Sequence, residues 1–219
     1  MKREKKLIAF DMDGTLLEGR TIQVLAEKHG FTEDLAKIQK DSNLKGYQKS
    51  EKIAVLLKGI HQDEIVKAVS GIKIIKNWRE TIEELKQQEH VLGIISDSYK
   101  VACDYLAKKM GLDFAIANKL DVDRKRVLTG EISMPLGWQK IGCACKISVC
   151  KRYHLEKMSE KFKIPLSNTV VVGDTISDLC MIERAGIGIA MMPKDEILEE
   201  KSDIVVRTHD LRKIIPVIL

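Results

Sequence analysis

Two carboxylates follow a short apolar run near the start of the chain. Residues 7–10 read LIAF, and Asp11 and Asp13 come directly after them, with Gly14 next. Aspartate is disfavoured in strands, and a carboxylate in apolar surroundings costs free energy unless a positive charge offsets it. This spacing therefore predicts either a polar turn or a site that binds a cation and carries out a reaction.

Two later apolar runs also lead into polar residues. Residues 91–95 (VLGII) precede Ser96, and residues 169–172 (TVVV) are followed closely by Asp174 and Asp178. In an open α/β sheet, ligands bind outside the carboxyl ends of the parallel strands. We therefore expect these side chains to converge with the first pair of aspartates on one crevice.

Such a group of side chains suits phosphoryl transfer. Clustered carboxylates repel one another unless a cation lies between them, and hard oxygen ligands of this kind select Mg²⁺. One carboxylate can form a covalent aspartyl-phosphate, while a second protonates the leaving alcohol and later activates water. A serine hydroxyl, backbone N–H groups and a lysine would hold the phosphate oxygens.

The apolar pattern predicts an α/β fold with a doubly wound, Rossmann-like parallel sheet. After Trp78, short apolar runs typical of buried strands alternate with helical segments. Before it, apolar residues recur at helical spacing, with glycines between the runs. We therefore predict an α/β core domain over residues 1–16 and 78–219 and an inserted helical-bundle cap over residues 17–77. Residues 120–134 predict a β-hairpin.

Composition excludes several classes of protein. The 219 residues are 44% hydrophobic, which suffices for a sizeable core, and the net charge of +5 is mild. No basic stripe interleaved with aromatic residues points to a nucleic acid. The apolar runs fall short of the roughly 18 residues that cross a membrane, and the first is too short for a signal peptide. We therefore expect a cytoplasmic protein without membrane or nucleic-acid partners, whose oligomeric state the sequence does not predict.

These motifs resemble those of the haloacid dehalogenase superfamily of aspartate-nucleophile phosphatases, and within it the phosphoserine phosphatase branch. DMDGTL at residues 11–16 resembles the DxDGT signature, Ser96 resembles the second motif, and GDTISD at residues 173–178 resembles the GDxxxD motif. The resemblance covers nearly the whole chain. It implies a Mg²⁺-dependent phosphomonoester hydrolase that acts on a small phosphorylated metabolite through an aspartyl-phosphate.

The resemblance also implies a role for each aspartate. Asp11 would attack phosphorus and help to bind Mg²⁺, and Asp13 would act as general acid/base with its backbone carbonyl on the metal. Asp174 would be a further metal ligand. Asp178 would support the water ligands of the metal and orient a lysine.

The resemblance further implies that three groups hold the phosphate oxygens. They are Ser96, the backbone N–H of Asp97 and a lysine upstream of the GDxxxD motif. Ungapped matching puts Lys151 in the place of that lysine, and Lys146 is the alternative.

Four positions depart from the phosphoserine phosphatase pattern, and all four concern substrate recognition. Arg20 stands where the branch has a glutamate for the substrate ammonium, and Ile53 stands near the place of an arginine for its carboxylate. Asp97 replaces a glycine, and Ser177 replaces an asparagine. A site built for charged groups loses much affinity when its partners vanish. We therefore expect a substrate that need not be phosphoserine and that places an anionic group near Arg20, unless a small register shift brings in Glu18.

Three other functions stay open. The first is true phosphoserine phosphatase activity in L-serine biosynthesis. The second is phosphoryl transfer to an acceptor other than water, for which the sequence shows no acceptor site. The third is a non-catalytic binding protein on the same fold. The intact set of Asp11, Asp13, Lys151 and Asp174 argues against the third, because clustered charges are costly to keep.

Three of the five cysteines lie close together in the sequence, at Cys143, Cys145 and Cys150, with His154 one helical turn further on. This group could bind a soft metal such as zinc. The irregular spacing and the presence of only three cysteines favour reduced thiols instead.

Overall fold

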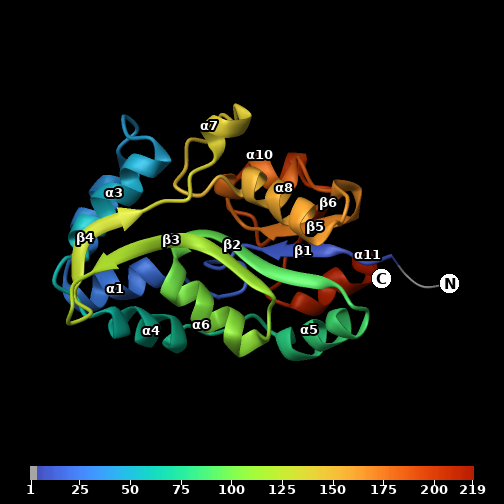
Figure 1. Ribbon diagram of the computed structural model, residues 1–219, viewed down its shortest axis with the longest axis horizontal. Coiled ribbons are helices and arrows are strands. Elements are labelled where there is room, and N and C mark those ends of the chain that lie inside the picture. Colours follow the sequence, from blue (N-terminus) through green and yellow to red (C-terminus); the bar gives the residue numbers. More distant parts are fainter. Residues whose placement is uncertain (1–3) are drawn as a thin grey trace.

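A central 7-stranded sheet organises the molecule (Figure 1). This computed structural model describes residues 4–219. The strands are β1 (Leu7–Phe10), β2 (Val91–Tyr99), β3 (Phe114–Val122), β4 (Leu128–Ser133), β5 (Thr169–Gly173), β6 (Ile187–Met191) and β7 (Ile204–Val206). Their order across the sheet is β4-β3-β2-β1-β5-β6-β7, and every neighbouring pair is parallel except β3 and β4. The chain thus has the α/β, Rossmann-like fold that the sequence predicts.

Helices cover both faces of the sheet. In Figure 1, α5 and α6 lie on one side and α8 and α10 on the other. Four helices between β1 and α5 form the segment that the sequence predicts as a cap. The helices are α1 (Thr21–His29), α2 (Thr32–Lys40), α3 (Gly46–Leu56), α4 (Gln62–Gly71), α5 (Trp78–Gln87), α6 (Lys100–Met110), α7 (Trp138–Ile141), α8 (Lys151–Phe162), α9 (Leu179–Ile182), α10 (Glu196–Lys201) and α11 (Ile215–Ile218), with 3₁₀ turns η1 (Leu166–Asn168), η2 (Ile176–Asp178) and η3 (Leu211–Ile214).

The first strand shows why the sheet is buried on both faces. Alternate residues of a strand point to opposite sides. Ile8 and Phe10 belong to the apolar cluster beneath α5 and α6, whereas Leu7 and Ala9 belong to the cluster beneath α8 and α10. A strand buried on both faces has no polar alternation, which explains the continuous apolar run of residues 7–10.

The hairpin of β3 and β4 is attached to the helices that follow β1. The N–H of Gly59 donates to the carbonyl of Leu128, and the N–H of Leu128 donates to the carbonyl of Ile60, both at 2.9 Å. α3 packs against β4. The helical segment and the hairpin therefore share backbone hydrogen bonds although they lie far apart in the sequence.

The second strand is longer than the sequence pattern predicts. The apolar run of residues 91–95 predicts a strand that ends before Ser96, but β2 continues to Tyr99 and α6 begins at Lys100. Its pairing with β3 shifts register between Ile95 and Tyr99, as at a β-bulge. Such a bulge re-aims side chains, so Ser96 and Asp97 lie within an irregular strand end.

None of the helices within residues 4–219 combines the length and the apolar character needed to span a bilayer.

Candidate active site

The loop after β1 is built around Asp11 and Gly14. Asp11 is buried, and its N–H donates to the carbonyl of Val172 at 2.9 Å, which extends the pairing of β1 with β5. Gly14 has a φ of +92°, and a Cβ atom there would lie 2.2 Å from Oδ2 of Asp174. The glycine of the first motif therefore lets the loop pass close to the carboxylate of the last one.

Three aspartates meet at the carboxyl ends of β1 and β5. Carboxylate oxygens of Asp11, Asp174 and Asp178 all lie within 4.8 Å of one another, and all three residues are buried. Oδ2 of Asp178 accepts hydrogen bonds from the N–H groups of Asp174 (3.0 Å) and Thr175 (3.1 Å). These bonds hold the loop after β5 in the shape that brings the carboxylates together.

A buried lysine supplies positive charge to this carboxylate group. Nζ of Lys151 lies 2.9 Å from Oδ1 of Asp11 and also contacts Asp178. Burial alone would lower the pKa of Lys151, but the carboxylates of Asp11 and Asp178 outweigh it and raise that pKa. Lys151 is therefore a fixed cation, whereas the alternative lysine, Lys146, is exposed.

The donor set of the carboxylate group fits Mg²⁺. Oδ1 of Asp174 is buried and has no hydrogen-bond partner among the described residues. A buried oxygen without a partner is costly, and a cation among hard oxygen ligands removes that cost. The side chain of Asp13 lies outside this group, so its predicted contribution through the backbone carbonyl stays a prediction.

Asp13 has a different environment from its neighbours. Its Oδ1 accepts hydrogen bonds from the N–H (3.0 Å) and the hydroxyl (2.8 Å) of Thr21 at the start of α1. Burial raises the pKa of Asp13 to about 6, although the bonds from Thr21 act in the opposite direction. A carboxyl group with a pKa near the working pH suits a general acid that later acts as a base.

The two phosphate-binding residues predicted in β2, Ser96 and Asp97, differ in their access to the cavity. A cavity of about 110 Å³ is lined by Asp11, Asp13, Asp97 and Ser98, among others. Ser96 is fully buried and does not line it; its hydroxyl accepts a long hydrogen bond of 3.3 Å from the N–H of Ser98. Of the predicted pair, Asp97 thus borders the cavity and Ser96 lies beneath its surface.

The predicted recognition residues Arg20 and Ser177 both line this cavity, and so does Ile53. Arg20 also lies 3.7 Å from Asp174, so its guanidinium faces the carboxylate group. Glu18 pairs with Lys73 at 2.9 Å and does not line the cavity. A register shift that would bring Glu18 into the site is therefore absent.

Two neighbours of the site have no counterpart in the sequence-based prediction. Asn118 in β3 is fully buried and donates to the carbonyl of Asp97 at 2.6 Å. Lys194 pairs with Asp174. The sequence does offer a signal for Asn118, because this polar residue directly follows the apolar run of residues 114–117. No local pattern marks Lys194.

The chain is similar over nearly its full length to proteins of known class. Residues 8–183 match the family of haloacid dehalogenase-like hydrolases. The chain is 36% identical over 218 residues to the phosphoserine phosphatase of Methanocaldococcus jannaschii, covering 98% of each chain. It is 29% identical over 216 residues to that of Campylobacter jejuni subsp. doylei, covering 97% of this chain and 99% of the other.

Solved structures agree with this similarity. A substrate-bound phosphoserine phosphatase complex superposes with a TM-score of 0.85 and 34% identity, covering 99% of this chain and 100% of the other. A phospho-aspartyl intermediate analogue of phosphoserine phosphatase gives a TM-score of 0.84 and 35% identity with the same coverage. With motifs, fold and relatives in agreement, this chain belongs to the haloacid dehalogenase-like hydrolase family.

Proposed function

We propose that this phosphatase hydrolyses L-phosphoserine with the help of Mg²⁺, through an aspartyl-phosphate on Asp11. The observation that carries the proposal is the contact of buried Asp11 with Lys151 beside Asp174 and Asp178. Such a pairing holds a positive charge beside the carboxylate that attacks phosphorus. The names of the relatives favour phosphoserine over an unspecified metabolite.

The reaction takes place in two displacements. An oxygen of Asp11 attacks phosphorus, the ester P–O bond breaks, and the leaving alkoxide takes a proton from Asp13. Asp13, now a carboxylate, then removes a proton from water, whose oxygen attacks the aspartyl-phosphate. The acyl phosphate P–O bond breaks, and inorganic phosphate and the Asp11 carboxylate are released.

Positive charge and donors around Asp11 hold the phosphate during both steps. Asp11, Asp174 and the backbone carbonyl of Asp13 would hold Mg²⁺, with support from Asp178, and the bound ion would supply positive charge to the phosphate oxygens. On the protein side we assign this role to Lys151. Ser96 and the N–H of Asp97 complete the set, with Ser96 acting from beneath the cavity surface.

Arg20 and Asp97 provide one charged partner each for the carboxylate and the ammonium group of phosphoserine. Both residues border the same cavity. Burial lowers the pKa of Arg20, but the charges of Asp174 and then Asp97 outweigh it and raise that pKa. We assign the substrate carboxylate to Arg20 and the ammonium group to Asp97. Ser177, whose hydroxyl lies 2.9 Å from that of Thr175, adds a polar group at the cavity rim.

The helices of residues 17–77 act as a cap in this proposal. The cavity is lined from this segment by Arg20, Gln39, Ser50 and Ile53, whereas Asp11 lines it from the loop after β1. Closing such a segment over a small substrate excludes water from the reacting atoms before attack.

A second candidate is hydrolysis of a small phosphomonoester that carries an anionic group and no ammonium group. Arg20 in the cavity wall favours it, since this arginine stands where the phosphoserine phosphatase branch has a glutamate for the substrate ammonium group. Arg20 then binds the anionic group, and Asp97 has hydroxyl groups as partners.

The two candidates are separated by a phosphate-release assay with Mg²⁺ and a panel of small phosphomonoesters. Dominant turnover of L-phosphoserine supports the first, and a clear preference for an ammonium-free substrate supports the second. Asp97→Asn sharpens the result: it should raise the KM for phosphoserine about 10-fold or more, because an ammonium group loses its charged partner. No phosphate release from any substrate, with Asp11→Asn as the inactive reference, would refute both.

A further inference from the structure

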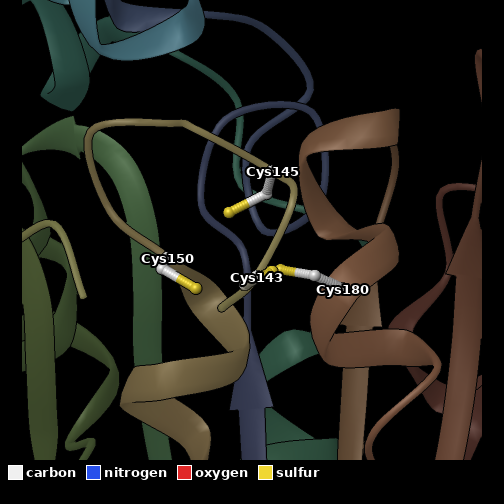
Figure 2. A group of neighbouring side chains, drawn as sticks. All are labelled: Cys143, Cys145, Cys150 and Cys180. Carbon is white, nitrogen blue, oxygen red and sulfur yellow. The ribbon is translucent and has the colours of Figure 1, made fainter. Parts of the chain in front are cut away.

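Four cysteines from two distant segments gather on the α8 side of the sheet. Cys143 and Cys145 lie in the loop between α7 and α8, Cys150 directly precedes α8, and Cys180 lies in α9. Figure 2 shows the four side chains converging on one place. Their Sγ atoms all lie within 4.8 Å of one another, although α8, β5 and two 3₁₀ turns separate Cys180 from Cys150 in the chain.

We propose that these four thiolates bind one Zn²⁺ ion in tetrahedral coordination. Zinc–sulfur bonds of about 2.3 Å place the sulfur atoms about 3.8 Å apart, so the observed group needs only a slight contraction. Four protein ligands without an open position are typical of structural zinc sites, and thiolates are soft ligands that such ions prefer.

The four sulfur atoms lie close enough together to bind a single ion. Throughout residues 4–219, which include all five cysteines, none is in a disulfide. The fourth ligand is Cys180, whereas His154, the neighbour that the sequence offers, is outside the group.

The surroundings of the cysteine group suit a bound metal ion. An open cleft lined by Cys143, Cys145 and Cys180 gives the ion a path from solvent. Arg152 and Arg184 line the same cleft, but both pair with Glu156, and Glu183 lines the cleft as well. The cysteine group is therefore accessible to an ion from solvent.

A metal at this place would brace the catalytic lysine. Cys150 is the residue before Lys151, and Cys180 is two residues beyond Asp178. Joining the two cysteines through one ion ties the start of α8 to α9 and so fixes the contact between Lys151 and Asp178. The cysteine group is thus a positioning site rather than part of the reaction.

The test measures zinc in the full-length protein purified in reducing buffer without chelators. We expect about one zinc ion per chain, and a loss of at least about 10-fold in Cys145→Ser and Cys180→Ser. Cys103→Ala, a buried cysteine outside the group, is the matched control and should keep the zinc. Asp174→Asn should also keep it, which separates this site from the carboxylate group.

A second measurement does not depend on the variants folding. Wild-type protein stripped of metal and given Co²⁺ should develop the visible absorption bands of tetrahedral cobalt thiolate, and Zn²⁺ should remove them. Protein that contains no zinc and gives no such bands would overturn the proposal. So would a disulfide within the group in the freshly purified protein, found by mass spectrometry, or zinc that disappears with Asp174→Asn.

Discussion

The carboxylate group and the cysteine group are neighbours with opposite chemistry. Asp178 and Cys180 are separated by one residue, and Lys151 and Cys150 are adjacent, so each group takes residues from the same two turns of chain. The carboxylates are buried at strand ends and offer hard oxygen ligands, whereas most of the cysteines are partly exposed and offer soft sulfur ligands. The same two short stretches of backbone, residues 150–151 and 178–180, therefore contribute to both the carboxylate group and the cysteine group.

The two groups would coordinate a metal ion in different ways. A reactive site must leave metal positions open to substrate and water, whereas a structural site fills them with protein ligands. Substitutions and metal removal can therefore disturb the carboxylate group and the cysteine group separately, with losses of activity that range from large to small.

Asp11→Asn removes the attacking carboxylate and should lower kcat by at least about 10⁴-fold, because the amide cannot form the covalent intermediate. Phosphate release under saturating substrate measures this loss. Zinc content should stay at the wild-type level. A variant that keeps substantial activity would exclude Asp11 as the nucleophile.

Gel filtration into Mg²⁺-free buffer should lower activity about 10³-fold, since the oxygen site loses a charge that stabilises the transition state. Added Mg²⁺ should restore it. Zinc should stay bound throughout, because four thiolates hold it more tightly than carboxylates hold Mg²⁺. Activity without Mg²⁺ would contradict the assignment of the carboxylate group.

Lys151→Met removes the buried cation that pairs with Asp11 and Asp178. Asp11 and Asp178 then lose a buried partner, so we expect the free energy of unfolding to fall by about 3–5 kcal/mol. We also expect kcat to fall about 10²–10³-fold. Urea unfolding and phosphate release measure the two effects.

Lys146→Met is the matched control for Lys151→Met, because Lys146 is exposed in the same region. It should change the free energy of unfolding by about 0.5 kcal/mol or less. Equal effects of the two substitutions would mean that the buried ion pairs of Lys151 contribute nothing specific.

Cys145→Ser breaks the cysteine group and should lower kcat by less than about 10-fold, because no cysteine contacts the reacting atoms. The free energy of unfolding should fall by about 1–3 kcal/mol and should no longer respond to added zinc. Urea unfolding with and without zinc measures this response. If Cys103→Ala lost the zinc response too, the effect would not belong to the four-cysteine group.

Local sequence patterns indicate the carboxylate group more clearly than the cysteine group. Residues 7–10 and 169–172 are continuous apolar runs followed by aspartates, and both form strands that place Asp11 and Asp174 together. The end of β2 was predicted wrongly, because its bulge depends on pairing with β3, which leaves no mark in residues 91–99 themselves. Predicted roles that rest on resemblance, such as that of Ser96, stay predictions.

Long-range contacts explain the remaining omissions. Cys180 has no cysteine near it in the sequence, so only the folded chain joins it to Cys145. Lys194 reaches Asp174 from the loop after β6 for the same reason. A residue that joins a site from a distant element has no fixed distance along the sequence to the other site residues, so no sequence pattern reveals it.

The hydrogen bonds between the hairpin and the helical segment have a consequence for dynamics. Helices that swing away from the cavity must either take the β3–β4 hairpin with them or break the bonds of Gly59 and Leu128. β3 also carries Asn118, which holds the carbonyl of Asp97. Amide hydrogen exchange at Gly59 and Leu128 would therefore report the opening of the cavity, and a bound phosphate analogue should slow it.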